Sequence, residues 1–148
     1  MVASVEELVQ VLQATLSPDV ATREQAEAYL KQHDYAKGYI VGLMQVATAP
    51  QADGGIRQAA AIHLKNISAK GWEPKREESP RLHEEDKTTI RANILESFIQ
   101  SPELIRSQLT EVMRVAVQHD FPERWPDLLT TLMGHLGTDD IARVYGAV

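Results

Sequence analysis

The stretch that decides the fold is HDFPERWPDLL, residues 119–129. Two prolines four residues apart, Pro122 and Pro126, separate an apolar helical pattern on one side from another on the other. Proline fixes φ and has no N–H to donate, so it suits the first turn of a helix and disfavours a helix interior. The segment therefore predicts a rigid corner between two helices, with Phe121 and Trp125 as large apolar anchors.

Outward from this corner, apolar residues recur at three- and four-residue spacing, and no alternating strand pattern competes with them. Ser4 and Glu7 stand at capping-box spacing and mark the start of the first helix. We predict four antiparallel helix pairs, over about residues 4–33, 35–71, 84–119 and 122–148. Apart from a charged loop over 73–83, each unit has about 35 to 40 residues, the range of helix-pair repeats. The expected fold is all-α, a right-handed α-solenoid.

The composition excludes several classes of protein. The chain has 148 residues, 43% of them hydrophobic and 24% charged, which is typical of a folded domain or a compact block of repeats. Fifteen basic and 21 acidic residues give a net charge of −6, which disfavours a non-specific nucleic-acid binder. There is no cysteine, so disulfides and cysteine-held metals are excluded. No apolar run approaches a membrane span, and the N-terminus lacks the pattern of a signal peptide.

Residues that could carry chemistry have simpler structural interpretations. His33-Asp34 and His119-Asp120 are adjacent pairs at helix ends, where the histidine favours the helix dipole and the aspartate caps the next turn. Glu84-Glu85-Asp86 indicates a solvated helix start. Trp72 and Trp125 are interpreted as structural anchors, because no basic groove surrounds them. The five histidines lack metal-ligand spacing, and no P-loop is present. We expect no enzyme activity, cofactor or metal.

One helix face is the exception. Arg57, Ala61, Lys65 and Ser68 lie at i, i+4, i+8 and i+11, off the apolar stripe of their helix, and Asn66 is one step round from Lys65. Two interpretations stay open from the residues alone. The face binds a partner, or it is a wetted surface with Asn66 capping the helix end.

Three blocks resemble the importin-β superfamily of nuclear transport receptors. The corner at 119–129 is similar to the family's acid-aromatic-Pro-x-x-Trp-Pro pattern. RQAAAIHLKN, residues 57–66, followed by Trp72, is similar to its Arg-Gln-x-Ala-x-x-x-Leu-Lys-Asn…Trp pattern. SPELIRSQL, residues 101–109, resembles the large import-receptor branch in particular. The order and spacing of the blocks extend the likeness over nearly all of the chain.

The resemblance implies a superhelix of HEAT repeats whose N-terminal repeats bind Ran in its GTP form. In that family the second helix of each pair lines the concave face, and Ran binding releases import cargo. The matching candidates for Ran contact are Arg57, Lys65 and Asn66, with Arg23, Glu27 and Arg114 as weaker ones. Import cargo and nucleoporins are implied as partners of a fuller-length receptor that shuttles between cytoplasm and nucleus. The resemblance does not imply nucleic acid or a membrane as a partner.

Receptors of this family are several times longer, so we expect the sequence to be the N-terminal part of a longer protein or a truncated product. Apolar residues Ile141, Val144, Tyr145 and Val148 have no following repeat to cover them, which predicts fraying or self-association at that end. The alternative function is an α-solenoid scaffold for protein–protein interaction that is unrelated to Ran.

Overall fold

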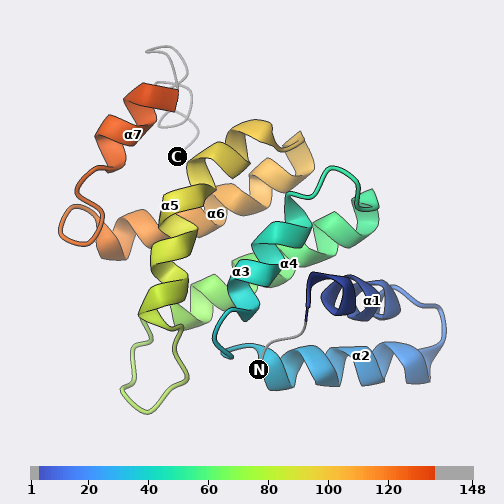
Figure 1. Cartoon of the computed structure of the whole chain (residues 1–148). Coiled ribbons are helices and arrows are strands. Elements are labelled where there is room, and N and C mark those ends of the chain that lie inside the picture. The colour runs from blue at the N-terminus through green and yellow to red at the C-terminus, as the bar shows by residue number, and fades with distance from the viewer. Residues whose placement is uncertain (1–3, 136–148) are drawn as a thin grey trace.

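The computed structural model describes residues 4–135, and its regular elements in that range are all α-helices (Figure 1). This confirms the predicted all-α class, and none of these helices is long and apolar enough to cross a bilayer. The helices are α1 (Val5–Thr15), α2 (Val20–His33), α3 (Tyr39–Ala47), α4 (Gly54–Gly71), α5 (Glu84–Gln100), α6 (Glu103–Asp120) and α7 (Leu128–His135).

The helices form two rows (Figure 1). The first helices of the units, α1, α3, α5 and α7, contact one another in succession, while α4 and α6 of the second row lie side by side. Within each unit the two helices pack together, α1 on α2, α3 on α4 and α5 on α6. A stack of helix pairs in which each unit touches its neighbours is the arrangement of an α-solenoid.

The core follows the apolar stripes and is densest around α3 and α4. In α4, buried positions recur around the helix because this helix packs against α1, α3 and α6 at once. Alanines at 60 and 61 leave room for the close approach of its neighbours, and both are fully buried. The other fully buried side chains include Leu8, Leu12, Leu43, Leu64, Ile90, Ile94 and Leu109.

The helix starts confirm the capping signals at the first unit. The Ser4 hydroxyl accepts a hydrogen bond from the Glu7 N–H at 3.2 Å, as the capping-box spacing predicts. Asp19 caps α2 in the same manner, accepting from the Thr22 N–H at 2.9 Å. These caps fix where the first two helices begin and so set the turn between them.

The corner that follows α6 is confirmed as a corner but not as a helix start at residue 122. Residues 121–127 form turns, the Phe121–Pro122 peptide bond is cis, and α7 begins only at Leu128. A helix begun at 122 would place Pro126 in its interior, where the ring clashes and a backbone bond is lost. Trp125 is 5% exposed, which confirms it as an anchor. The predicted eighth helix and the apolar residues 141–148 lie outside the described residues.

Candidate interaction surface

The prediction that these α4 positions form one exposed polar face is wrong. Ala61 and Ser68 are fully buried, and Arg57 and Lys65 are only half-exposed at the border of the same packed side. The reason is the place of α4 in the middle of the stack, where packing covers more than the apolar stripe. The exposed side of α4 instead includes Asn66 and the residues one turn further along the helix. Asn66 does not cap the helix, which continues to Gly71.

Arg57 is engaged within its own helix pair. Its Nε–H donates to the carbonyl oxygen of Ala47 at 3.0 Å, so the side chain ties the start of α4 to the end of α3. A cation there also matches the negative end of the α3 dipole. Arg23 has a similar place in the first unit, where its guanidinium donates to the Ser17 carbonyl at 3.3 Å. Both arginines therefore have a structural role at a turn between paired helices.

The remaining candidates are spread over the second row. Glu27 on α2, Asn66 on α4 and Arg114 on α6 are exposed, and Lys65 is half-exposed. Arg114 forms an exposed ion pair of 3.5 Å with Glu111, a contact that costs little to break. The six residues thus do not gather into one cluster. They are distributed over three helices, α2, α4 and α6.

Charged groups on or next to α2 and α4 act on one another, which the sequence did not indicate. Burial lowers the pKa of His63, although the charges of Asp34 and Glu27 act in the opposite direction. Burial raises the pKa of Asp34, with His63 and Lys70 opposing. The α2 residue Glu27 and the α4 residue His63 are therefore within electrostatic range of each other. No local pattern could show this, because the partners are far apart in the chain.

A buried charged network lies where the ends of α4 and α6 meet α5. Asp120, 1% exposed, accepts hydrogen bonds at one carboxylate oxygen from Trp72 Nε1–H at 2.8 Å and from Arg91 at 2.6 Å. The interpretation of Asp120 as a cap for the next turn is therefore wrong. Its side chain turns inward because two donors from α5 and the end of α4 meet it there. Trp72, 1% exposed, is confirmed as a structural anchor.

The same network extends along the start of α5. Arg91 also donates to Glu84 at 2.9 Å, and Lys87 donates to the Trp72 carbonyl at 3.1 Å. Burial lowers the pKa of Arg91, but the bonds to Glu84 and Asp120 outweigh it and hold the pKa above its usual value. These contacts join α4, α5 and α6, so we call Trp72, Glu84, Lys87, Arg91 and Asp120 the junction network.

The acidic start of α5 is only partly solvated, contrary to the sequence interpretation. Asp86 is buried and accepts the Gly38 N–H at 2.8 Å, while the neighbouring Glu85 pairs with Lys37 at 2.7 Å on the surface. Gly38 has φ of 86°, a backbone conformation that glycine adopts without strain. The link therefore holds the start of α3 against the start of α5.

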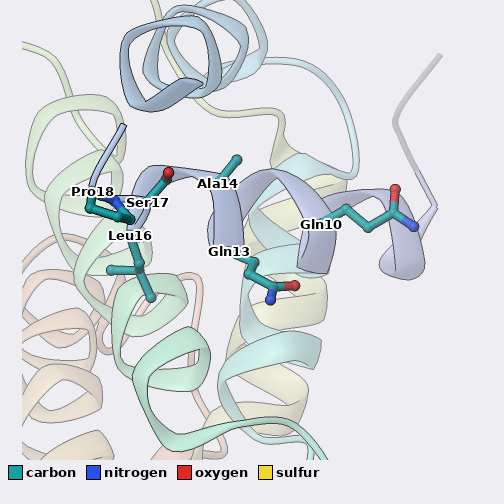
Figure 2. A pocket seen from close by; sticks show the side chains of 6 residues that line it. All are labelled: Gln10, Gln13, Ala14, Leu16, Ser17 and Pro18. Atoms are coloured by element: carbon teal, nitrogen blue, oxygen red, sulfur yellow. The ribbon is translucent and has the colours of Figure 1, made fainter. Parts of the chain in front are cut away.

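Within residues 4–135, clusters of metal ligands and pockets are the features that could bind an ion or a small molecule. No group of three histidine or acidic residues in this range could hold a metal ion. Figure 2 shows a hollow at the end of α1, lined by neutral residues: Gln10, Gln13, Ala14, Leu16, Ser17 and Pro18. It offers no titratable group.

Comparison with known protein families gives a match for this chain. The profile described as "Importin-beta N-terminal domain" matches residues 26–100, from within α2 to the end of α5. The chain belongs to the importin-β family. The matched range contains the 57–66 block, Trp72 and three members of the junction network on α5. The corner at 119–129 lies outside the range that the importin-β profile matches.

Relatives with curated names include both importins and exportins. The chain is 38% identical over 126 residues to Importin-8 of Mus musculus, which covers 80% of the chain and 12% of the relative. It is 31% identical over 146 residues to Exportin-2 of Oreochromis niloticus, covering 99% of the chain and 15% of the relative. The chain therefore spans about one seventh of such proteins. Because relatives of both names match, the likeness does not distinguish import from export.

The solved structure of "The exportin Cse1 in its cargo-free, cytoplasmic state" has the same fold. The TM-score is 0.81 at 24% identity, and the match covers 93% of this chain and 14% of that one. This confirms the predicted α-solenoid of HEAT-type pairs for the importin-β domain.

Proposed function

We propose that this chain is the N-terminal, Ran-GTP-binding region of a nuclear import receptor that carries proteins through the nuclear pore. The observation that supports this most is the family match across α2–α5 together with the exposed surface on α2, α4 and α6. Import is favoured by the 101–109 block, which resembles the large import-receptor branch. Cargo and nucleoporins would bind through the fuller-length receptor as it shuttles between cytoplasm and nucleus. The proposal includes no enzyme activity.

The physical argument concerns how two nucleotide forms of one GTPase can be distinguished. A GTPase orders its switch loops through contacts to the γ-phosphate and releases them on hydrolysis. A receptor that recognises the GTP form must therefore contact those loops. A broad surface built from several rigid helices can meet ordered loops without rearranging, which keeps the entropy cost of binding low.

The positions of the candidate residues indicate which of them are best suited to contact Ran. Lys65 and Asn66 are adjacent on α4, with Glu27 on α2 and Arg114 on α6 on either side of it in the second row. Arg57 and Arg23 already donate to carbonyl oxygens of the protein, so their guanidinium groups are less suited to a new partner. We therefore expect Lys65 and Asn66 to contribute most.

The test is the double change Lys65→Ala with Asn66→Ala. We expect it to weaken binding of GTP-form Ran at least about tenfold, equal to about 1.4 kcal/mol. The thermal midpoint should hardly change, because neither side chain is fully buried. The matched control is Asn93→Ala with Glu96→Ala, an exposed amide and an exposed charge on α5, in the other row. It should leave binding within twofold.

Binding would be measured by biolayer interferometry with Ran locked in each nucleotide form. The assay uses the 148-residue chain and the same chain continued into the remaining repeats of the Importin-8 relative. Equal binding of wild type and double variant would place the contacts elsewhere. Preference of the continued wild type for the GDP form, or binding of neither form, would refute the transport-receptor proposal and favour the scaffold alternative.

Transport direction has its own measurement. Two ligands of one receptor change each other's affinity by the same factor, so the sign of that coupling can be read from either side. In an import receptor Ran-GTP weakens cargo binding, and cargo weakens Ran-GTP binding equally. A coupling of the opposite sign in the continued chain would indicate export and would overturn the import part of the proposal.

A further inference from the structure

The sequence contains three Ser-Pro dipeptides, and the structure separates them into two kinds. Ser17-Pro18 lies between α1 and α2, Ser101-Pro102 lies between α5 and α6, and Ser79-Pro80 lies in the charged loop over 73–83. A serine directly before proline is the pattern that proline-directed protein kinases phosphorylate. The question is which of the three hydroxyls such an enzyme can reach without unfolding a helix pair.

Two of the serines hold their turns together. Ser101 is 2% exposed, and its hydroxyl donates to the Ser97 carbonyl at 2.6 Å. The Ser101 carbonyl in turn accepts from Arg106 Nε–H at 2.7 Å, so the turn into α6 is fixed from both sides. The Ser17 hydroxyl accepts from the Asp19 N–H at 3.1 Å, at the residue that caps α2. Phosphorylation of Ser101 would require the turn into α6 to open, and phosphorylation of Ser17 would disturb the hydrogen bond beside the cap of α2.

Ser79 differs from both. It is half-buried in a loop whose residues 75–78, 80 and 81 are exposed, and it lies outside every helix and helix cap. The residues from Pro80 to His83 have no regular structure. A residue before proline is biased towards extended backbone, the conformation in which a substrate segment lies in a kinase cleft. The segment can therefore bind there without loss of any helix.

The loop also holds a cation, Arg81, two residues after Ser79 and bonded to the same turn. The Ser79 N–H donates to the Arg76 carbonyl at 3.2 Å, which closes a turn over 76–79. The Arg81 guanidinium folds back onto the same turn and donates to the Glu77 carbonyl at 3.3 Å. That bond is long and exposed, so Arg81 can exchange it for a stronger partner. A phosphoryl group on Ser79 carries a charge of about −1.5 to −2 at neutral pH and bonds well to arginine.

We propose that Ser79 is a phosphorylation site for a proline-directed serine/threonine kinase, and that Arg81 binds the added phosphoryl group and orders the loop. In this reaction the Ser79 Oγ forms a bond to the γ-phosphorus of ATP. The bond from that phosphorus to its bridging oxygen breaks, ADP leaves, and the hydroxyl proton passes to the base of the kinase.

The first experiment incubates the 148-residue chain with ATP and a recombinant MAP kinase or, separately, a cyclin-dependent kinase. Peptide mass spectrometry then locates the phosphate. We expect one phosphate per chain, at Ser79, with Ser79→Ala abolishing incorporation and Pro80→Ala reducing its rate at least tenfold. The matched control Ser17→Ala should stay within twofold of wild type. Incorporation at Ser17 or Ser101 as fast as at Ser79, or no incorporation by either kinase, would overturn the proposal.

The second experiment tests the role of Arg81 by hydrogen exchange on the phosphorylated chain. We expect amides of residues 76–82 to exchange at least about threefold more slowly after phosphorylation, and the change Arg81→Gln to remove this protection. Phosphorylation without slower exchange, or slower exchange that survives Arg81→Gln, would show that Arg81 does not hold the phosphate.

Discussion

The first helix pair and the junction of α4, α5 and α6 are held by different means. In the first pair α2 buries only Ala26 and Leu30, and the large apolar residues Leu16 and Val20 remain about half-exposed. The junction buries a tryptophan, an arginine and an aspartate in mutual contact. Among the described helices α2 contacts mainly α1, whereas α4 contacts α1, α3 and α6, so stability is expected to be uneven along the stack.

The buried charges of the junction have a role other than net stability. Removing two charges from water costs several kcal/mol, which their attraction repays only with good geometry, so the Arg91–Asp120 pair is weak evidence for net stability. What the pair does is define one arrangement, because Asp120 matches donors from two other segments at once. The junction thus fixes how the second and third units meet, whereas the polar contacts of the first pair are local, at its caps and its turn.

Of the changes considered, Asp120→Ala should reduce the stability of the junction most. The change leaves Trp72 Nε1–H and one side of Arg91 without their acceptor in a buried site. We expect a loss of about 3 to 5 kcal/mol in the free energy of unfolding, measured by urea denaturation. The control Glu111→Ala breaks the exposed pair with Arg114 and should cost less than about 0.5 kcal/mol. Similar midpoints for the two variants would show that the junction network is not formed in solution.

Trp125→Ala tests the corner next to the junction. Trp125 is 5% exposed, so its truncation leaves a cavity, and we expect a loss of about 3 to 5 kcal/mol. The neighbouring change Asp127→Ala, at an exposed position of the same turn, serves as the control. An unchanged urea midpoint for Trp125→Ala would show that the indole is free in solution and available to a partner.

Leu30→Ala addresses the other side of the comparison. Leu30 is one of two buried residues of α2, and its truncation should cost about 2 to 3 kcal/mol. Because α2 contacts mainly α1, we expect the effect to be local. Hydrogen exchange should show faster exchange in α1 and α2 with protection retained in α4 and α6. Uniform loss of protection across all helices would mean that the first pair is as firmly held as the junction.

The smallest expected effect is a pH dependence from His63 on α4. Burial lowers the pKa of His63 from 6.5, against the opposing charges of Asp34 and Glu27. The unfolded chain therefore takes up this proton at a higher pH than the folded chain does, so stability falls as pH decreases through about 6.5. The change His63→Gln should reduce the difference in thermal midpoint between pH 7.5 and 5.5. Identical differences in both proteins would show that His63 is solvated.

What the sequence could predict was local or carried by the family patterns. Apolar spacing located the helices, the Ser4 cap marked the start of α1, and the corner residues pointed to the buried Trp125. The inward turn of Asp120 and the burial of Ser68 were missed, because both depend on donors and helices that the chain brings from far away. The same holds for the candidate contacts. Helical spacing placed Lys65 and Asn66 together but could not show that Arg57 bonds to Ala47.

The loop over 73–83 has its two ends joined, since the Leu82 N–H donates to the Gly71 carbonyl at 2.9 Å. The long-range bonds Gly38–Asp86 and Trp72–Asp120 each connect residues 48 apart, and both span this loop. A cut within the loop would therefore separate the protein into two fragments that each keep whole helix pairs and share the α4–α6 contact. The intact backbone contributes only an effective concentration to that contact. We expect the two fragments to reassemble when mixed, which makes the loop a suitable place to split this protein into a reporter of its own assembly.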